Sequence, residues 1–390
     1  MIKQKMLWIG TVAVLVILMI FGLAMMGSVL GAKPKSLPVA FVMLDQPIDL
    51  PGSGTMALGE MIGQKVSGLE QLPIDWKLMS SEEEAQEAMK RQAVYGVLVI
   101  PTGFSKGVQS LQTPSPNPAT VRVYVNEGLN MQAATMVKTI LGQVMRNVQV
   151  EMTSQLLEQI GQRAPQLPVS SMQGLLTPFL VEEITSHSAG ENNGNGSAPN
   201  MLVQIVWIGS LVGSAFLYLA ARNANQAGGR KWQNSTMQVL LAVAFALVNS
   251  LFTLWMAKSW YGMEVDDATS VWMFLWLMAA AFMLLQLSLV NWIGLAGIGL
   301  CVLLFFFSMP LLNLPPEFMS QATQDWIYSW TPLRYAASGL RNIMYFGGEE
   351  GMLLPLGVMW WLVGICAVLL LASALRKNDD KAMKGSAMKA

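Results

Sequence analysis

MLVQIVWIGSLVGSAFLYLAA, residues 201 to 221, is a run without a single charged side chain. About 20 apolar residues in a helix cross the roughly 30 Å hydrocarbon core of a bilayer, so this run is long enough to span a membrane. Gly209 with Gly213, and Ser210 with Ser214, lie four residues apart, and such small faces favour close packing against another helix. The stretch therefore predicts a helical membrane protein.

The rest of the chain agrees with this prediction. Of the 390 residues, 53% are hydrophobic and 12% are charged, against about 25% charged in a soluble globular protein. Five further runs are long and apolar enough to span a bilayer as helices. The six predicted spans are residues 7–30, 201–221, 237–257, 271–290, 293–312 and 353–375.

The first of these runs, residues 7–30, also resembles a secretory signal peptide because Lys3 and Lys5 precede it. Its apolar stretch is much longer than the 7 to 15 residues of a signal peptide, and SVLGAKP is a weak cleavage site. We therefore expect residues 1–32 to form an uncleaved transmembrane anchor.

The basic residues predict the orientation of the spans, because Lys and Arg in short polar segments stay in the cytoplasm. With the N-terminus inside, the cytoplasmic segments hold ten of them: Lys3, Lys5, Arg222, Arg230, Lys231, Arg376, Lys377, Lys381, Lys384 and Lys389. The short outer loops hold three, namely Lys258, Arg334 and Arg341. We expect a multi-pass protein of the cell (plasma) membrane with both termini in the cytoplasm, the C-terminal one being the basic tail 376–390.

Residues 33–186 are predicted to form an extracytoplasmic α/β domain between the first and second spans. β-Branched or alternating runs bounded by Pro, Gly or Asp, at 38–44, 74–79, 95–100 and 119–125, predict strands. Helical spacing appears in TMALGEMIGQKVSGL and in SEEEAQEAMKRQ, where Ser81 and Glu84 form a potential capping box. The alternation of strands and helices predicts a small α/β sandwich.

Two segments complete this domain in the sequence. A long helix is expected from about 130 to 161, and a second helical piece near 171–186. HSAGENNGNGSAPN, residues 187–200, is rich in Gly and Asn and is predicted to be a polar linker that leads back to the membrane.

Residues able to carry catalysis or hold metal are scarce. His187 is the single histidine, which argues against a His-based triad or a multi-histidine metal site, and we expect it to be a solvated linker residue. Cys301 and Cys366 both lie in apolar runs, and no G-x-x-x-x-G-K-[ST] phosphate-binding loop is present. We predict no enzyme activity, no cofactor or metal in this chain and no nucleic-acid partner.

Polar residues inside the predicted spans are few. Gln204, Asn249, Gln286 and Asn291 could line a transport pathway, although hydrogen bonds that join helices are the more common role of such groups. No Asp, Glu, Lys or Arg lies deep in a span, which argues against a carrier that works through buried carboxylates.

TPLRYAASGLRNIMYFGG, residues 331–348, predicts an amphipathic helix at about 332–345 beside the last span. Arg334 and Arg341 lie next to its apolar stripe, so the helix can rest at the outer membrane interface with its guanidinium groups in the headgroups. Two roles remain open: an anchor for the final span, or a gate in which Arg341 holds the outer mouth closed through a bidentate contact.

Three motifs carry a resemblance to a known family: VAFVMLDQP at 39–47, YGVLVIPTGFSKGV at 95–108 with YVNEGLN at 124–130, and TPLRYAASGLRNIMYFGG. With the anchoring span, the insertion and five further spans (residues 201–375), the chain resembles ABC-2 type transporter permeases, in the branch shared with the phage infection protein (Pip/YhgE-like) family. The resemblance covers nearly the whole chain. It implies that Pro332, Tyr335 and Arg341 lie in short helices that dip into the outer leaflet.

The resemblance implies a permease subunit of an ABC exporter that moves an amphipathic or hydrophobic substrate outward. Partners implied are a separate ABC ATPase, which would bind ATP, a second copy in a homodimer, and membrane lipids. Many such permeases carry an amphipathic interface helix before the first span, and about six residues stand there in this chain. The loop 222–235, with Arg222, Arg230 and Lys231, is therefore the best expected ATPase-coupling surface. The alternative is a surface scaffold, phage receptor or secretion-accessory protein, and a membrane-bound enzyme is a distant third.

Overall fold

The computed structural model describes residue 19 and residues 35–50, 54–68, 72–111, 113, 117–163, 176–190, 192–348 and 350–376. These residues divide into two compact units. The α/β unit contains the described residues from 35 to 190 together with 314–320, and the helical unit contains residue 19 and the described residues of 192–313 and 321–376.

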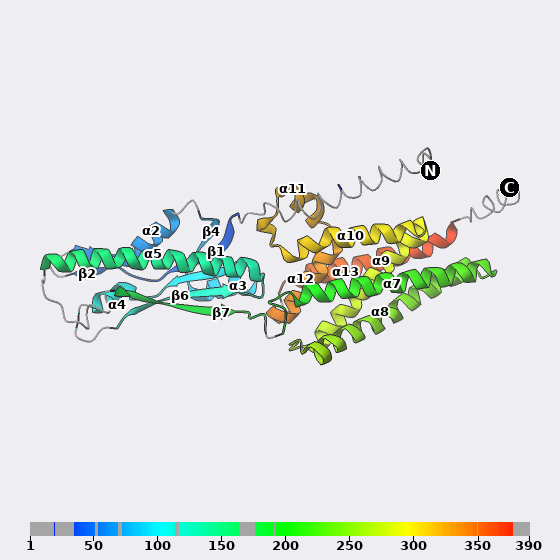
Figure 1. The fold of residues 1–390 in the computed structure, drawn as a ribbon, viewed down its shortest axis with the longest axis horizontal. Helices are drawn as coiled ribbons and strands as arrows, with labels where there is room; N and C mark the ends of the chain where they lie inside the picture. Colours follow the sequence, from blue (N-terminus) through cyan, green and yellow to red (C-terminus); the bar gives the residue numbers. More distant parts are fainter. Residues whose placement is uncertain are drawn as a thin grey trace, which may run out of the picture. The chain divides into compact units, whose positions relative to one another are not determined.

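A five-stranded sheet forms the α/β unit (Figure 1). Its order is β4-β1-β5-β6-β7, where β1 pairs with β4 and β5 in parallel, β5 with β6 antiparallel, and β6 with β7 in parallel. The strands are β1 (Leu37–Met43), β4 (Ile74–Met79), β5 (Gly96–Ile100), β6 (Ala119–Asn126) and β7 (Phe179–Ser186). The four predicted strands are thus confirmed. The order of the strands in the sheet was not predicted from the sequence.

Helices cover both faces of this sheet because alternate side chains of its buried strands point to opposite sides. Val39 and Phe41 of β1 join the larger core with helices α2 (Leu58–Gly68), α4 (Phe104–Ser110) and α5 (Met131–Arg163). Ala40 and Val42 face the opposite way and pack with α3 (Glu82–Lys90). Ser81 caps α3 by accepting the Glu84 backbone N–H at 3.1 Å, which confirms half of the predicted capping box. The Glu84 carboxylate accepts the backbone N–H of Ser80 at 2.9 Å, one residue before the expected partner.

Two features of the α/β unit differ from the sequence prediction. The helix expected near 171–186 is wrong over 179–186, because β7 pairs along its whole length with β6 and this pairing outweighs a weak helical pattern. The hairpin of β2 (Ile48–Leu50) and β3 (Gly54–Met56) was not predicted. Residues 314–320, between two predicted spans, also group with this unit, and Tyr95 donates to the Glu317 carboxylate at 2.8 Å.

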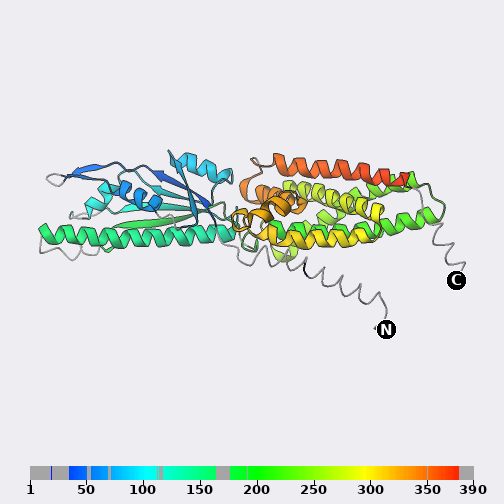
Figure 2. The same ribbon diagram turned by 90° about the horizontal axis from the view of Figure 1, so that it is seen from above.

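Five long apolar helices run side by side in the helical unit (Figures 1 and 2). They are α7 (Ala198–Gln226), α8 (Lys231–Tyr261), α9 (Ala268–Ile293), α10 (Ala296–Asn313) and α13 (Leu353–Ala372). Each is long and apolar enough to cross a membrane, and each overlaps a predicted span. Apart from residue 19, the first predicted span lies outside the described residues, as does the basic tail beyond residue 376.

Helix α9 is the centre of this unit and contacts α7, α8, α10 and α13. It is apolar all round, as a helix surrounded by others must be. Ala279, Ala280 and Ala281 are almost completely buried, and their small side chains let neighbouring helices approach closely.

Shorter elements lie between α10 and α13: η1 (Pro316–Phe318), α11 (Gln321–Thr323), the π-helical turn η2 (Gln324–Tyr328) and α12 (Pro332–Phe346). A final turn, η3 (Ser373–Leu375), follows α13. Helix α12 agrees with the predicted amphipathic helix and ends at Gly347, whose φ of 75° suits glycine. The linker boundary needs correction, because α7 begins at Ala198 and includes Asn200.

Candidate functional site

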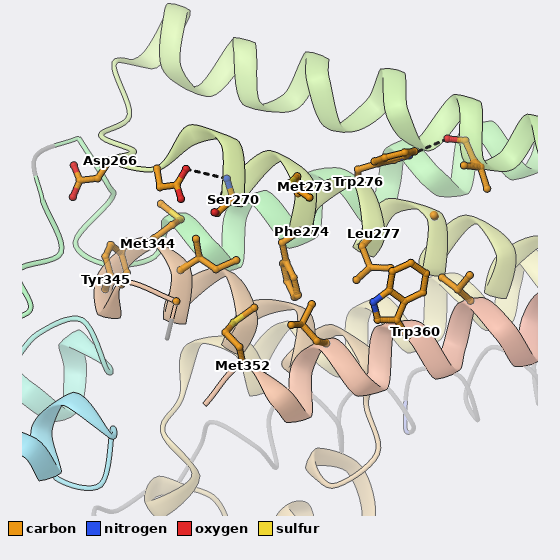
Figure 3. Close-up of a pocket in the computed structure, with 18 residues that line it drawn as sticks. Asp266, Ser270, Met273, Phe274, Trp276, Leu277, Met344, Tyr345, Met352 and Trp360 are labelled. Carbon is orange, nitrogen blue, oxygen red and sulfur yellow. Dashed lines mark hydrogen bonds between the residues drawn. The ribbon is translucent and has the colours of Figure 1, made fainter. Parts of the chain in front are cut away.

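A pocket of about 720 Å³ opens among α8, α9, α12 and α13 (Figure 3). Its walls are mainly apolar, and the large side chains that form them are Phe274, Trp276, Leu277, Met344, Met352 and Trp360. Ligand pockets in proteins commonly measure 300–1,000 Å³ and are lined by apolar and aromatic groups with few polar ones. This pocket therefore has the size and chemistry of a site for an apolar or amphipathic molecule.

Helix α9 forms the floor of the pocket. Phe274, Leu277 and Ala280 follow one another at steps of three residues and so lie on one helix face. Helix α12 approaches this face at Gly339, where a Cβ atom would overlap the ring of Phe274. The absence of a side chain at Gly339 thus lets α12 pack against α9 and shape the pocket.

Carboxylates stand at one end of the pocket. Asp266 and Asp267 are both exposed, and Figure 3 shows Asp266 at the end away from Trp276. Asp267 caps α9, since its Oδ1 accepts the backbone N–H groups of Ser270 at 3.0 Å and Thr269 at 3.1 Å. Hydrogen bonds from Ser270 and Thr269 lower the pKa of Asp267, so this carboxylate stays ionised at neutral pH. No Lys or Arg is among the described residues that line the pocket.

Tyr345 adds a polar group to the wall. Its side chain is 8% exposed, it lines the pocket, and its hydroxyl has no hydrogen-bond partner among the described residues. Burial raises its pKa to about 12, with a smaller opposing effect of Arg341, so the hydroxyl keeps its proton. A buried hydroxyl without a partner has a free energy cost that a ligand could remove.

The residues predicted on the outer helix lie in two places on α12. Pro332 begins the helix, and the Arg334 guanidinium lies 4.2 Å from the ring centroids of both Tyr328 and Tyr335. Arg334 also donates to the Tyr335 hydroxyl at 2.7 Å. This cluster ties the start of α12 to the π-helical turn before it.

Arg341 makes a different contact, near the other end of α12. Its Nη2 donates to Asn200 Oδ1 of α7 at 3.4 Å. Asn200 is buried, and its Nδ2 donates to the Leu312 carbonyl at 2.7 Å and to Asn313 Oδ1 at 3.2 Å, both in α10. One asparagine thus connects α7, α10 and α12.

Sequence reasoning missed Asn200 because it was assigned to the polar linker. Pro199 stands at the second position of α7, and proline is favoured in the first turn of a helix. Proline before the apolar run was the available sign that the helix starts early.

The residues predicted to couple to an ATPase lie where α7 ends and α8 begins. Arg222 of α7 and Lys231 of α8 line a polar cavity of about 690 Å³ together with Arg376. Lys231 Nζ donates to the Arg376 carbonyl at 2.7 Å, and the Arg376 guanidinium donates to the Trp292 carbonyl. Arg230 is exposed at the N-cap of α8 and is not among the lining residues.

The polar residues predicted inside the spans mostly join helices. Asn249 of α8 donates to the Val206 carbonyl of α7 at 3.2 Å and to Ser210 Oγ at 3.3 Å. Gln286 of α9 is fully buried and donates to the Trp207 carbonyl of α7 at 3.2 Å. These contacts fit the helix-joining role that the sequence left open.

The other two polar residues are placed differently. Gln204 is partly buried on α7. Asn291 donates to the Leu287 carbonyl of its own helix at 2.8 Å and lines the polar cavity with Arg222 and Lys231. None of the four lines the apolar pocket.

The histidine and the two cysteines lie outside both cavities. His187 is partly buried, and burial with a smaller effect of Lys90 lowers its pKa, so it is neutral at pH 7 and not the solvated residue expected. Cys301 and Cys366 are buried. Within the described part of the chain, no group of three or more His, Cys, Asp or Glu is arranged to hold a metal ion.

Comparison with known proteins gives two matches. The family described as ABC-2 family transporter protein matches residues 5–375. A crystallised domain from Thermotoga maritima MSB8, described as part of an ABC type-2 transporter, is 21% identical with a TM-score of 0.27. That match covers 38% of this chain and 84% of the crystallised domain. No curated protein matches the chain.

Proposed function

Because the chain belongs to the ABC-2 family of transporter proteins, we propose that it is the permease subunit of an ABC-type exporter. In this proposal a separate ATPase drives the subunit, which moves an amphipathic or hydrophobic substrate outward across the cell membrane. A second copy of the chain forms the other half of the transporter, as a homodimer.

The apolar pocket is the observation that carries the proposed substrate class. Its volume of about 720 Å³ and its aromatic and methionine walls suit a molecule with a large apolar part. Methionine side chains are flexible and polarizable, so they adapt to ligands of different shapes. Helix α12 reaches the pocket through Ile343, Met344 and Tyr345 near its end. It also carries Pro332, Arg334, Tyr335 and Arg341, and it is the proposed gate.

The polar cavity at the other ends of the helices supports the proposed coupling surface. Arg222, Lys231 and Arg376 line it, no acidic residue does so in the described chain, and Arg230 stands exposed beside it. Basic side chains here suit an acidic surface on a nucleotide-binding subunit. The pathway role of Gln204, Asn249, Gln286 and Asn291 is secondary in this proposal.

Reversing the charge of Arg230 and Lys231 to Glu should abolish co-purification of an ATPase with the chain while leaving membrane insertion intact. Like charges across an interface oppose association, and four units of charge change at one contact should weaken binding by about 100-fold. Affinity purification followed by mass spectrometry measures the bound ATPase. Lys258→Glu, at the other end of α8, is the matched control and should retain the partner.

An ATPase that stays bound to the Arg230→Glu, Lys231→Glu variant would contradict this contact. If no ATPase co-purifies with the unchanged chain, the alternative gains: a Pip/YhgE-like surface scaffold, phage receptor or secretion-accessory protein.

The proposed orientation predicts a labelling pattern. In a chain with Cys301→Ala and Cys366→Ala, single cysteines are introduced as Ala93→Cys, Glu264→Cys and Ala227→Cys, all at exposed positions. An impermeant maleimide should label the first two in intact cells and label Ala227→Cys only after the membrane is opened. Labelling of Ala227→Cys in intact cells would overturn the assignment of both termini to the cytoplasm.

A further inference from the structure

We propose that the apolar pocket among α8, α9, α12 and α13 binds an amphipathic organic cation, with its apolar body between the helices and its positive group at Asp266 and Asp267. This inference rests on the proposed export function and narrows the substrate from amphipathic molecules in general to hydrophobic cations.

The walls determine the shape of the ligand. Phe274, Trp276 and Trp360 supply large rings, and Met344 and Met352 supply flexible side chains. A bulky, partly aromatic body fills such a space better than a straight acyl chain does. The rings also attract positive charge, because a cation near the face of an aromatic ring is favoured electrostatically.

The carboxylates at one end of the pocket determine the sign of the charge that the ligand carries. Asp266 and Asp267 are the charged residues among those that line the pocket, and both are acids. The two hydrogen bonds that cap α9 both end on Asp267 Oδ1. Neither backbone N–H of the cap uses its Oδ2, which leaves this oxygen able to accept a contact from a cationic group while the backbone cap stays in place. An anionic ligand would meet two carboxylates and no base within the described lining.

Tyr345 is an independent sign of a ligand. Its hydroxyl is buried in the wall without a hydrogen-bond partner among the described residues. Buried polar groups without a partner are uncommon and each needs an explanation. The oxygen is covered by protein in this structure, so a ligand that carries an N–H group would supply the missing contact once the Tyr345 side chain turns toward the pocket.

The test uses two probes of the same shape and opposite charge, tetraphenylphosphonium and tetraphenylborate. Binding is measured by equilibrium dialysis on the purified chain in a neutral detergent, without any ATPase. We expect the cation to bind at least about ten-fold more tightly than the anion. The double substitution Asp266→Asn, Asp267→Asn should lower the affinity for the cation by about ten-fold. This is the change expected from loss of charge contacts near the surface.

The control variants separate charge from folding. Asparagine caps helices as well as aspartate does, so Asp267→Asn keeps the start of α9. Glu264 lies in the same loop, but its carboxylate does not line the pocket. Glu264→Gln should therefore leave the affinities for both probes unchanged. Ala280→Phe fills the floor and should abolish binding of both probes.

Tyr345→Phe tests the hydroxyl separately. Rhodamine 6G is a hydrophobic cation with N–H groups, and its affinity should fall several-fold in this variant, as expected for one neutral hydrogen bond. Tetraphenylphosphonium has no N–H group and should bind as before.

Equal binding of the two tetraphenyl probes, or unchanged cation binding after loss of both carboxylates, would overturn the inference and leave an apolar pocket for a neutral lipid. Probe binding that survives Ala280→Phe would place the cation site elsewhere. Cation binding without any ATP-driven transport would instead reject the proposed exporter and keep the site.

Discussion

Gly339→Leu is expected to lower the midpoint of thermal unfolding of the detergent-solubilised chain by about 5 °C. A Cβ at this position would overlap the ring of Phe274, which is 3% exposed, so either the ring or helix α12 would have to leave its packed position. Overpacking of this kind costs about 1–3 kcal/mol. Each kcal/mol shifts the midpoint by about 2–4 °C in a unit of about 150–250 residues, which is the size range of the helical unit. Differential scanning fluorimetry measures the shift.

A double variant makes this prediction specific to the contact. Phe274→Ala removes the ring and opens space, so Gly339→Leu combined with Phe274→Ala should be more stable than the sum of the two single effects indicates. Gly357→Leu in α13 is the matched control, because nothing lies within 4 Å of a Cβ built there. Equal midpoints for Gly339→Leu and Gly357→Leu would show that α12 does not pack against α9 at this position.

Arg341→Ala is expected to reduce transport by about ten-fold or more at matched membrane levels. The substitution removes the donor to Asn200, which connects α12 to α7 and α10. A hydrogen bond from a charged group contributes about 1.5–3 kcal/mol, so its loss should shift the balance between the closed and open forms of the proposed gate. The measurement is export of the substrate, or resistance of cells to it.

Arg341→Lys distinguishes a gate from an anchor. A gate needs the planar guanidinium to reach Asn200, which lysine does not reproduce, so transport should fall here as well. Asn200→Leu should reduce transport at least as much as Arg341→Ala, since it removes the partner of Arg341 and also the bonds from α7 to Leu312 and Asn313 of α10. Full activity of Arg341→Lys would show that positive charge alone suffices and that α12 only anchors the final span.

The long helices could be predicted from the sequence because their length and apolar character do not depend on what surrounds them. Helices α9 and α13, for example, are both strongly apolar and were both predicted as spans, but only packing places α9 at the centre of the unit and leaves α13 largely exposed. The strands β1 and β5 could be predicted for a similar reason, as continuous apolar runs that a parallel sheet buries on both faces.

The pocket could not be predicted, because it depends on how separate helices pack. Gly339 and Phe274 lie 65 positions apart in the chain, and nothing in either local pattern indicates their contact. The local sequence around Asp267 indicates only a helix cap, and that around Tyr345 indicates only an amphipathic helix. Strand β7 was mistaken for a helix because its partner β6, and not its own pattern, determines its conformation.

The most direct test of the proposed exporter uses proteoliposomes that hold the chain and the ATPase that co-purifies with it. ATP is added outside, where the ATPase of correctly oriented complexes is exposed, and the accumulation of rhodamine 6G inside is followed by fluorescence. We predict accumulation that requires ATP, requires both subunits, and is lost when the phosphate-binding lysine of the ATPase is replaced. Equal accumulation in vesicles that contain the ATPase without this chain would contradict its role as the permease.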